Sequence, residues 1–379
     1  MLTKLANSRF SIFLVKLFVF LRLYNIMRRF FIHYSRLSSR KTFAKIKKDY
    51  ILDIPETIFF EPTYRCNLNC EMCYQDRASI TEKNELTLEQ IKHIFLNQIK
   101  GIKKVNLIGG EIFVRKDIFE IIHFFDSRGI SVHITTNGTL INDTTYKKLS
   151  NCSNIQAIGF SIDGTEELHN KMRNSRKAFH QTVQGLKLAK RKFFVFVVSV
   201  LTKSNIGFLK EIVELVNELC LSNLIIEFER KYTNDDLREA SSVLGFPEQD
   251  FPLTVSESKE VDYSYQFLKE NIEAAECRAK ALGIRIYYLP DNFLEKLETH
   301  YNKSNRFNGK YFCKSMFKGR IDSKGDVFHC YAIRKSFGNV LEKPFSDIWN
   351  SQEYIDFRHK LTDNNLLSLC ETCLYMEFV

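Results

Sequence analysis

The chain has 379 residues, of which 44% are hydrophobic and 26% charged, and its formal net charge is +10. This length exceeds one ordinary hydrophobic core, and the composition excludes a disordered or collagen-like chain. Residues 1–50 carry twelve basic side chains and one acidic one, so the rest of the chain is close to neutral and a nucleic-acid-binding body is excluded.

The N-terminal arm, residues 1–50, is rich in Phe and Leu but is interrupted by Lys16 and Arg22. It is a poor fit both to a membrane-spanning helix, which needs about twenty largely apolar residues, and to a cleaved signal peptide. A membrane-spanning helix is the least favoured of three interpretations that remain open, and the other two are about equal. Residues 1–45 form an amphipathic helical anchor on an anionic membrane surface, or the arm packs on the body with Lys and Arg stems over apolar surface.

Short β-branched or aromatic runs alternate with stretches of helical period from Ile58 onward. This alternation predicts an α/β fold, a partial (β/α)6 TIM-like barrel of parallel strands joined by helices. The six predicted strands are 58–62, 104–109, 130–136, 155–163, 193–201 and 224–229, and the helices between them are 87–99, 117–128, 142–150, 178–191 and 207–220.

Beyond the sixth strand, residues 231–262 are polar and charge-rich, which indicates an insertion or lid. A helix over 263–282 and a strand over 284–290 follow. From about residue 307, Gly, Asp and Cys punctuation is typical of a small metal-binding unit. We therefore expect a barrel domain over 51–285 and a C-terminal domain over 286–379.

Three cysteines, Cys66, Cys70 and Cys73, directly follow the first predicted strand in "RCNLNCEMCY". This loop belongs to the carboxyl ends of the strands, where such barrels carry their active sites. The C-x3-C-x2-C spacing suits a four-iron cluster in which one iron has no protein ligand, and an open metal position is typical of catalytic sites. The alternatives are three buried thiols or a zinc site with a remote fourth ligand.

This loop resembles the radical S-adenosylmethionine (radical SAM) superfamily, whose hallmark is CxxxCxxC in a partial (β/α)6 barrel. Gly109, Gly110 and Glu111 resemble its GGE motif, which receives the amino group of the cofactor, although Ile112 stands where relatives usually have Pro. The resemblance implies a [4Fe-4S] cluster whose fourth iron binds S-adenosylmethionine (SAM). It also implies an electron donor of the flavodoxin or ferredoxin type and a 5′-deoxyadenosyl radical that removes a substrate hydrogen atom.

Polar residues at the next strand ends extend the resemblance. In relatives, the positions of Asn137, Ser161 and Asp163 lie along the ribose and carboxylate of the cofactor, and Arg173 in "HNKMR" matches an arginine on that carboxylate. Taken singly, these residues are also typical of turns and helix starts. Their joint placement at successive strand ends favours cofactor binding.

A second cysteine set comprises Cys313, Cys330, Cys370 and Cys373. Four thiolates complete either a cluster or a zinc site, so both remain open on the residues alone. Residues 337–361 resemble the SPASM and twitch extensions of radical SAM enzymes, and the absence of further cysteines after "CETC" implies the twitch form with one auxiliary [4Fe-4S] cluster. Cys152, Cys220 and Cys277 are expected to be buried, inert thiols.

Among relatives of this layout, the resemblance implies an oxidoreductase that dehydrogenates a sugar-like or other small metabolite, with the auxiliary cluster accepting an electron. The first alternative is a maturase that crosslinks, epimerises or forms thioethers in a ribosomally made peptide. The second is a non-catalytic iron–sulfur protein on the membrane surface. Because the cysteines are bunched as metal ligands, the expected compartment is the cytoplasm, with peripheral contact at the inner membrane face under the anchor interpretation.

Overall fold

The computed structural model describes residues 50–73, 85–230, 232–251, 255, 263–290, 294, 297–298, 311–371, 373 and 375–378. The chain divides into two compact units, Met1–Ile51 with Val379, and Leu52–Phe378. Almost all of the predicted N-terminal arm lies outside the described residues, so all three interpretations of it stay predictions. Over the described part of the chain, the helices lack the combination of length and apolar character that a membrane span requires.

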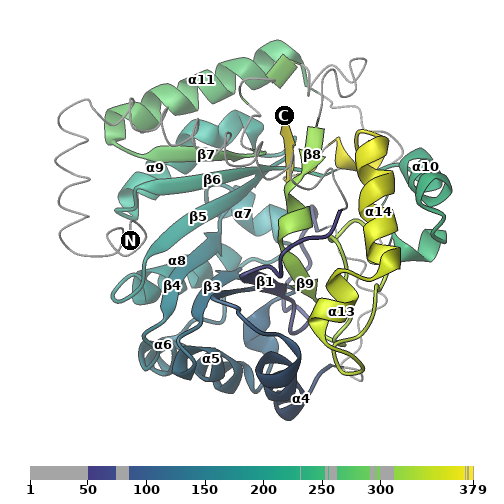
Figure 1. Ribbon diagram of the computed structural model, residues 1–379. Helices are drawn as coiled ribbons and strands as arrows, with labels where there is room; N and C mark the ends of the chain where they lie inside the picture. The colour runs from purple at the N-terminus through teal and green to yellow at the C-terminus, as the bar shows by residue number, and fades with distance from the viewer. Residues whose placement is uncertain are drawn as a thin grey trace, which may run out of the picture. The chain divides into compact units, whose positions relative to one another are not determined.

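An eight-stranded sheet forms the centre of the second unit (Figure 1). All neighbouring strands are parallel, in the order β7-β6-β5-β4-β3-β2-β1-β9. The predicted parallel α/β fold is therefore confirmed, and the six predicted barrel strands and the strand over 284–290 are all present. The strands are β1 (Thr57–Phe60), β2 (Lys104–Leu107), β3 (Ser131–Thr136), β4 (Ile155–Ser161), β5 (Val195–Leu201), β6 (Asn223–Phe228), β7 (Arg285–Leu289) and β9 (Gly319–Ile321).

Helices cover the outer face of the sheet, as Figure 1 shows for α5, α8, α9 and α11. Aromatic residues make this contact near β1, where the Phe60 ring lies 5.4 Å from Phe95, which in turn lies 4.8 Å from Phe125. The helical segments are α4 (Leu88–His93), the π-helical η2 (Ile94–Gln98), η3 (Ile112–Val114), α5 (Ile118–Ser127), α6 (Asp143–Ser150), α7 (Glu166–Met172), α8 (Ala178–Ala189), η4 (Ile206–Phe208), α9 (Leu209–Glu218) and α11 (Tyr265–Leu282).

The other face of the sheet carries polar and charged residues near β1. Side chains alternate between faces along a strand, so Phe59 and Glu61 point away from the helix-covered face that Phe60 occupies. On the neighbouring strand, Arg320 is the register partner of Phe59, and its guanidinium lies 4.5 Å from the Phe59 ring. Charged groups therefore enter the inner face where the C-terminal segment joins the sheet.

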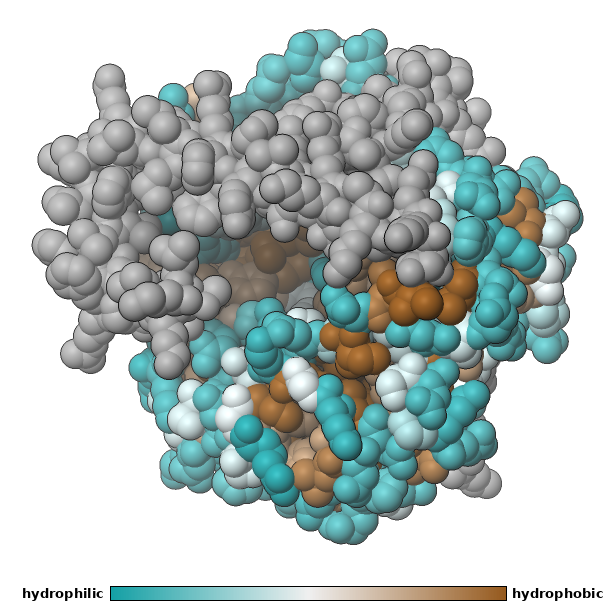
Figure 2. All heavy atoms as spheres, viewed as in Figure 1, coloured by the Kyte–Doolittle hydropathy of each residue, from teal (hydrophilic) through white to brown (hydrophobic). Residues whose placement is uncertain are grey.

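The C-terminal segment contributes a strand to the main sheet, because β9 pairs with β1. The remaining elements pack around an aromatic core in which Phe337 stacks on Tyr354 with ring centroids 4.0 Å apart. In Figure 2, hydrophobic residues gather toward the middle of the face shown, while hydrophilic ones dominate its lower and right-hand edges. The elements are β8 (Tyr311–Cys313), η8 (Lys314–Phe317), α13 (Phe345–Trp349), α14 (Gln352–Asp363), η9 (Ser368–Cys370) and β10 (Met376–Phe378).

The predicted insertion contains a capped helix, α10 (Asn234–Leu244), followed by η5 (Glu248–Asp250). Thr233 and Asp236 form a capping box at its start, and Gly245 ends it with a positive φ of 74°. Helix α10 packs against α14 and η9, so this stretch belongs with the C-terminal elements. A lid role for residues 231–262 stays a prediction.

Candidate functional site

The loop after β1 carries the first cysteine set and is held by backbone hydrogen bonds from two directions. The Gly110 N–H donates to the Thr63 carbonyl at 3.0 Å, and the Glu111 N–H donates to the Arg65 carbonyl at 2.8 Å. Farther along, the Glu71 N–H donates to the Met172 carbonyl at 2.9 Å. The loop is therefore held between the end of β2 and the end of α7.

Cys66, Cys70 and Cys73 are each partly exposed, and predicted cofactor residues lie against two of them. The Asn137 side-chain amide lies 3.8 Å from the Cys66 sulfur, and Nη1 of Arg173 lies 3.6 Å from the Cys70 sulfur. The Cys73 N–H donates to the Cys70 carbonyl at 3.3 Å. Residues from the end of strand β3 and the end of helix α7 thus meet the cysteine loop.

The two glycines of the GGE motif allow the cysteine loop to approach β2. A Cβ at Gly109 would lie 2.3 Å from the Thr63 carbonyl oxygen, and one at Gly110 would lie 2.2 Å from the Arg65 carbonyl oxygen. Gly109 also has a φ of +133°, a backbone conformation that residues other than glycine rarely adopt. The glycines are therefore required by contacts within the protein, in addition to the close cofactor approach that the motif implies.

Glu111 is fully buried, and its carboxylate accepts hydrogen bonds from three donor groups. Donors are the Asn137 N–H at 2.7 Å, the Thr136 hydroxyl at 2.8 and 2.9 Å, and the Phe113 N–H at 3.3 Å. Burial raises the pKa of Glu111 to about 7, although these hydrogen bonds and the Arg173 charge act in the opposite direction. The carboxylate is therefore oriented but titrates near neutral pH.

If Glu111 accepts the amino group of SAM, as the resemblance implies, this pKa predicts that SAM binding weakens in mild acid. A protonated Glu111 cannot hold an amino group as an ionised carboxylate does, so the Kd for SAM should rise about tenfold as the pH falls from 8 to 6. Anaerobic equilibrium dialysis of the reconstituted protein measures this Kd at each pH. In Glu111→Gln, binding should be weak at both pH values. An unchanged wild-type Kd between pH 8 and pH 6 would contradict this role for Glu111.

Asp163 and Arg173 form a buried ion pair beside the cysteine loop. Both Nε and Nη2 of Arg173 contact Oδ2 of Asp163, at 2.7 and 2.6 Å, and the Val200 N–H donates to Oδ1 at 3.0 Å. Burial lowers the pKa of Arg173, but the charges of Asp163 and Cys70 and the hydrogen bonds to both groups together hold the pKa above its ordinary value. The Asp163 carboxylate is fully buried and orients the Arg173 guanidinium through these contacts.

His169 supports the same turn, and sequence reasoning placed it only as part of the "HNKMR" element. The Asp163 N–H donates to its Nδ1 at 3.2 Å. Burial lowers the pKa of His169 to about 4, so it accepts this bond as a neutral imidazole. Ser161 is the last residue of β4 and is partly exposed, and its contact with the cofactor stays a prediction.

The three remaining cysteines lie away from both sets in sequence, and only one of them is buried as expected. Cys152 is buried after α6, and burial raises the pKa of its thiol to about 11. Cys220 and Cys277 are exposed, so the expectation of burial was wrong for these two. Cys220 follows the end of α9 with a φ of +50°, and Cys277 lies on the solvent side of α11.

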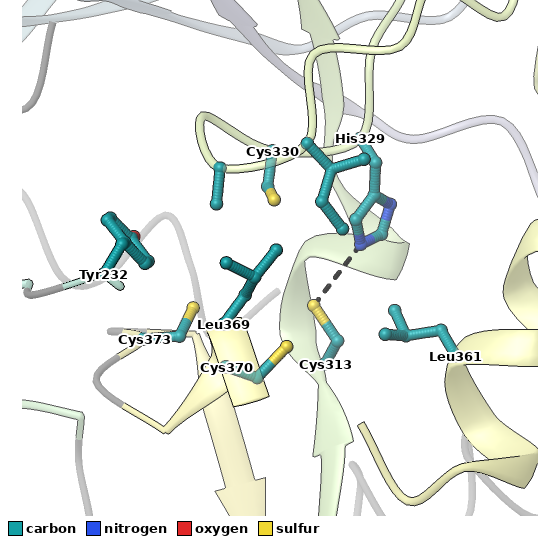
Figure 3. A pocket seen from close by; sticks show the side chains of 10 residues that line it. Tyr232, Cys313, His329, Cys330, Leu361, Leu369, Cys370 and Cys373 are labelled. Atoms are coloured by element: carbon teal, nitrogen blue, oxygen red, sulfur yellow. Dashed lines mark hydrogen bonds between the residues drawn. The ribbon is translucent and has the colours of Figure 1, made fainter. Parts of the chain in front are cut away.

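The second cysteine set converges on one pocket, because β10 pairs with β8 and brings Met376 opposite Cys313. Figure 3 shows the sulfurs of the four cysteines turned toward the space between them. The lining residues are Cys313, Cys330, Cys370 and Cys373 together with Tyr232, His329, Ala332, Ile333, Leu361 and Leu369.

The chemistry of this pocket fits a metal cluster held by thiolates. Burial, and then the charge of Cys373, raises the pKa of the Cys330 thiol to about 11, and the other three thiols also have raised pKa values. Four such groups cannot be deprotonated together without a cation between them. The arrangement therefore suits an iron–sulfur cluster or zinc.

Two residues of this pocket escaped sequence reasoning, Tyr232 and His329. Nε2 of His329 lies 3.4 Å from the Cys313 sulfur, and its Nδ1 lies 3.3 Å from the Tyr354 hydroxyl. Burial lowers the pKa of His329 to about 3, so the ring is neutral. Its position directly before Cys330 was the one available signal, whereas nothing in the sequence linked Tyr232 to cysteines almost a hundred residues away.

Both cysteine sets lie in segments that match known protein families. Residues 60–219 match the family described as the radical SAM superfamily, and residues 313–374 match an iron–sulfur cluster-binding domain of the SPASM type. The AdoMet-dependent heme synthase of Methanosarcina barkeri is 29% identical over 85% of this chain and 89% of that protein. The subtilosin biosynthesis protein AlbA of Bacillus subtilis is 30% identical over 42% of this chain and 36% of its own length.

Solved structures share the fold. Streptococcus suis SuiB, crystallised with its precursor peptide SuiA, superimposes with a TM-score of 0.61 over 90% of this chain and 76% of that one. The two sequences are 19% identical, so this likeness concerns the fold alone.

Proposed function

Because the chain belongs to the radical SAM superfamily and carries a SPASM-type cluster-binding domain, we propose that it cleaves SAM reductively and removes a hydrogen atom from its substrate. Its cofactors are SAM, the [4Fe-4S] cluster that binds SAM, and auxiliary iron–sulfur. In our proposal, the overall reaction is the oxidation of a small metabolite.

One observation carries the proposal: the chain contains an open cysteine set and a closed one. Three partly exposed cysteines stand at the carboxyl end of β1 beside Asn137 and Arg173. Four further cysteines line a separate pocket. Three thiolates leave one iron free for SAM, whereas four complete an auxiliary site.

In the proposed site, Cys66, Cys70 and Cys73 hold the first cluster. When bound, this cluster supplies the electron that cleaves SAM to a 5′-deoxyadenosyl radical. The buried Glu111 carboxylate accepts the amino group of SAM, beside Gly109 and Gly110.

The remaining predicted residues act on the other end of the cofactor. Arg173 pairs with its carboxylate, and Asp163 holds the guanidinium in place. Asn137 and Ser161 bind toward the ribose. These groups would fix the position of SAM beside the cysteine loop.

Net oxidation is favoured by the closed character of the second site. Cys313, Cys330, Cys370 and Cys373 would hold a cluster whose four irons all have protein ligands, so it would have no position for substrate and would supply an electron acceptor. In the proposed oxidation, the substrate alcohol would give up a hydrogen atom, then one electron and its hydroxyl proton, and become a carbonyl; a cluster bound at the second site would supply the electron acceptor. We propose one auxiliary cluster, because the described cysteines outside the two sets do not join this pocket.

Anaerobic reconstitution tests the proposal. The protein should hold about eight irons per chain, four for each cluster, and reduction with dithionite in the presence of SAM should yield 5′-deoxyadenosine by chromatography. A fully loaded protein that forms none would refute the enzymatic function. About four irons with one zinc would refute the auxiliary cluster and with it the oxidative reaction.

The other predicted partners have less support from the structure and the comparisons. A ribosomally made peptide stays a predicted alternative substrate, since the likeness to SuiB concerns the fold and the match to AlbA covers under half of the chain. A flavodoxin or ferredoxin-type donor and a peripheral membrane contact of residues 1–45 also stay predictions. Release from anionic liposomes after deletion of residues 1–45 would support the membrane contact, and unchanged binding would contradict it.

A further inference from the structure

Two arginines from opposite ends of the sheet meet at the residue that follows an auxiliary cysteine. Tyr331 comes directly after Cys330. The guanidinium of Arg230, just beyond β6, lies 3.9 Å from the centre of the Tyr331 ring, and that of Arg320, in β9, lies 5.3 Å from it. Tyr331 therefore connects the second cysteine site with the inner face of the sheet.

Arg320 is a buried cation with few partners. Its side chain has no exposed surface, and none of its three guanidinium nitrogens has a hydrogen-bond partner with normal geometry among the described residues. It is surrounded mainly by rings, with the centres of Phe59 and Tyr375 at 4.5 and 5.3 Å. A buried charge in such surroundings is costly unless an anion offsets it.

The nearest carboxylate does not fully neutralise the charge of Arg320. Oε1 of Glu61 lies 3.8 Å from Nη1 of Arg320, while Oε2 of the same carboxylate accepts a hydrogen bond from Arg334 at 2.8 Å. One carboxylate thus serves two guanidinium groups. The cluster of Glu61, Arg320 and Arg334 retains one positive charge.

The auxiliary thiols lie within electrostatic reach of this charge, as do the hydroxyls of Tyr375 and Tyr331. Arg320 acts electrostatically on the thiols of Cys330 and Cys373, and Arg230 acts on Cys373. An iron–sulfur cluster with four thiolate ligands is an anion, and nearby charge is one of the determinants of its reduction potential. A positive charge stabilises the reduced form, which carries one more negative charge, over the oxidised form.

We propose that Arg320, assisted by Arg230, raises the reduction potential of the auxiliary cluster and so enables it to accept the electron from the substrate radical. This inference rests on the proposed function, because it assigns a purpose to the second site within that reaction. Both arginines are positioning residues that act through the cluster and need not touch the substrate.

The test is a redox titration of the full chain carrying Cys66→Ala, Cys70→Ala and Cys73→Ala, followed by electron paramagnetic resonance without SAM or substrate. Only the auxiliary cluster then gives a signal. Arg320→Met should lower the equilibrium constant for reduction about tenfold, which is about 59 mV for one electron. Arg320→Lys keeps the charge and should restore most of the potential. Equal potentials for the Met and Lys variants would overturn the proposal.

Two further variants separate electrostatics from folding. Arg278→Met removes the same charge from an exposed ion pair with Glu214 between α11 and α9, and should leave the potential unchanged. If Arg320→Met fails to retain iron, Arg230→Met takes its place and should lower the potential in the same direction. An equal shift in Arg278→Met, or none in Arg230→Met, counts against the proposal.

The titration also separates this inference from the proposed function. It needs no SAM cleavage, so a protein that fails to form 5′-deoxyadenosine still reports the effect of Arg320. If the protein that keeps Arg320 gave no paramagnetic resonance signal from the second site, for example because that site binds zinc, the inference would be overturned directly.

Discussion

Replacement of Cys66, Cys70 and Cys73 by alanine is expected to abolish 5′-deoxyadenosine formation and to remove about half of the bound iron, because one of two four-iron clusters loses all its protein ligands. The four cysteines of the second pocket remain intact. Iron and sulfide analysis, with chromatography of the SAM products, measures both effects in one preparation.

A matched control comes from the exposed cysteines outside both sets. The double variant Cys220→Ala and Cys277→Ala removes thiols that are accessible to solvent, and it should keep both the iron and the activity. Substantial 5′-deoxyadenosine from the triple variant, or complete loss of iron from it, would contradict the assignment of two independent sites.

Asp163→Asn is expected to destabilise the protein and to weaken SAM binding together. The substitution leaves Arg173 as a buried cation without its carboxylate, and breaking a buried pair in this way costs roughly 3–5 kcal/mol. The free energy of unfolding, measured with a denaturant on the reconstituted protein, should fall accordingly. The Kd for SAM should rise at the same time, because Arg173 loses the group that orients it.

The exposed pair of Glu214 and Arg278 provides the comparison for this prediction. Its two side chains also meet through two contacts, but both remain over 30% exposed. Water and salt screen such pairs, so Glu214→Gln should differ little from wild type in stability. If Asp163→Asn were as mild as Glu214→Gln, the buried pair would not be what holds Arg173 in place.

The sequence predicted which segments meet at the first site, because the cysteine loop, the GGE motif and Asn137 each follow a strand, while the cofactor roles of these residues stay predictions. The carboxyl ends of parallel strands meet at one edge, so a cysteine loop after β1, GGE after β2 and Asn137 after β3 are placed together by topology alone. Contacts such as Asn137 with Cys66 and Arg173 with Cys70 follow from that order. Their exact partners depend on side-chain packing, which periodicity does not encode.

The role of β9 could not be predicted in the same way. It has three residues, and an arginine stands at its centre, whereas buried strands are usually recognised by longer apolar runs. Its pairing with β1 joins residues over 250 positions apart. The contacts between Arg320, Glu61 and Arg334 depend on that pairing, so they were equally hidden.

The predicted helix boundaries and the predicted burial of two cysteines differ less from the structure. The predicted helix over 87–99 divides into α4 and the π-helical η2, because local hydrogen-bond spacing depends on packing as well as on period. Cys220 and Cys277 were expected to be buried on the basis of the usual behaviour of isolated cysteines. Both are exposed, since the apolar faces of α9 and α11 are formed by other residues.

Strand β9 also has a consequence for how the protein gains and loses its structure. It covers the outer edge of β1, whose unpaired backbone groups would otherwise invite association with other chains. The segment that holds the second cysteine set therefore completes the sheet that supports the first. We expect the two sites to fold and unfold as one cooperative unit, so that a chain cut after residue 290, which keeps β7 but lacks β9, would aggregate instead of yielding a free barrel.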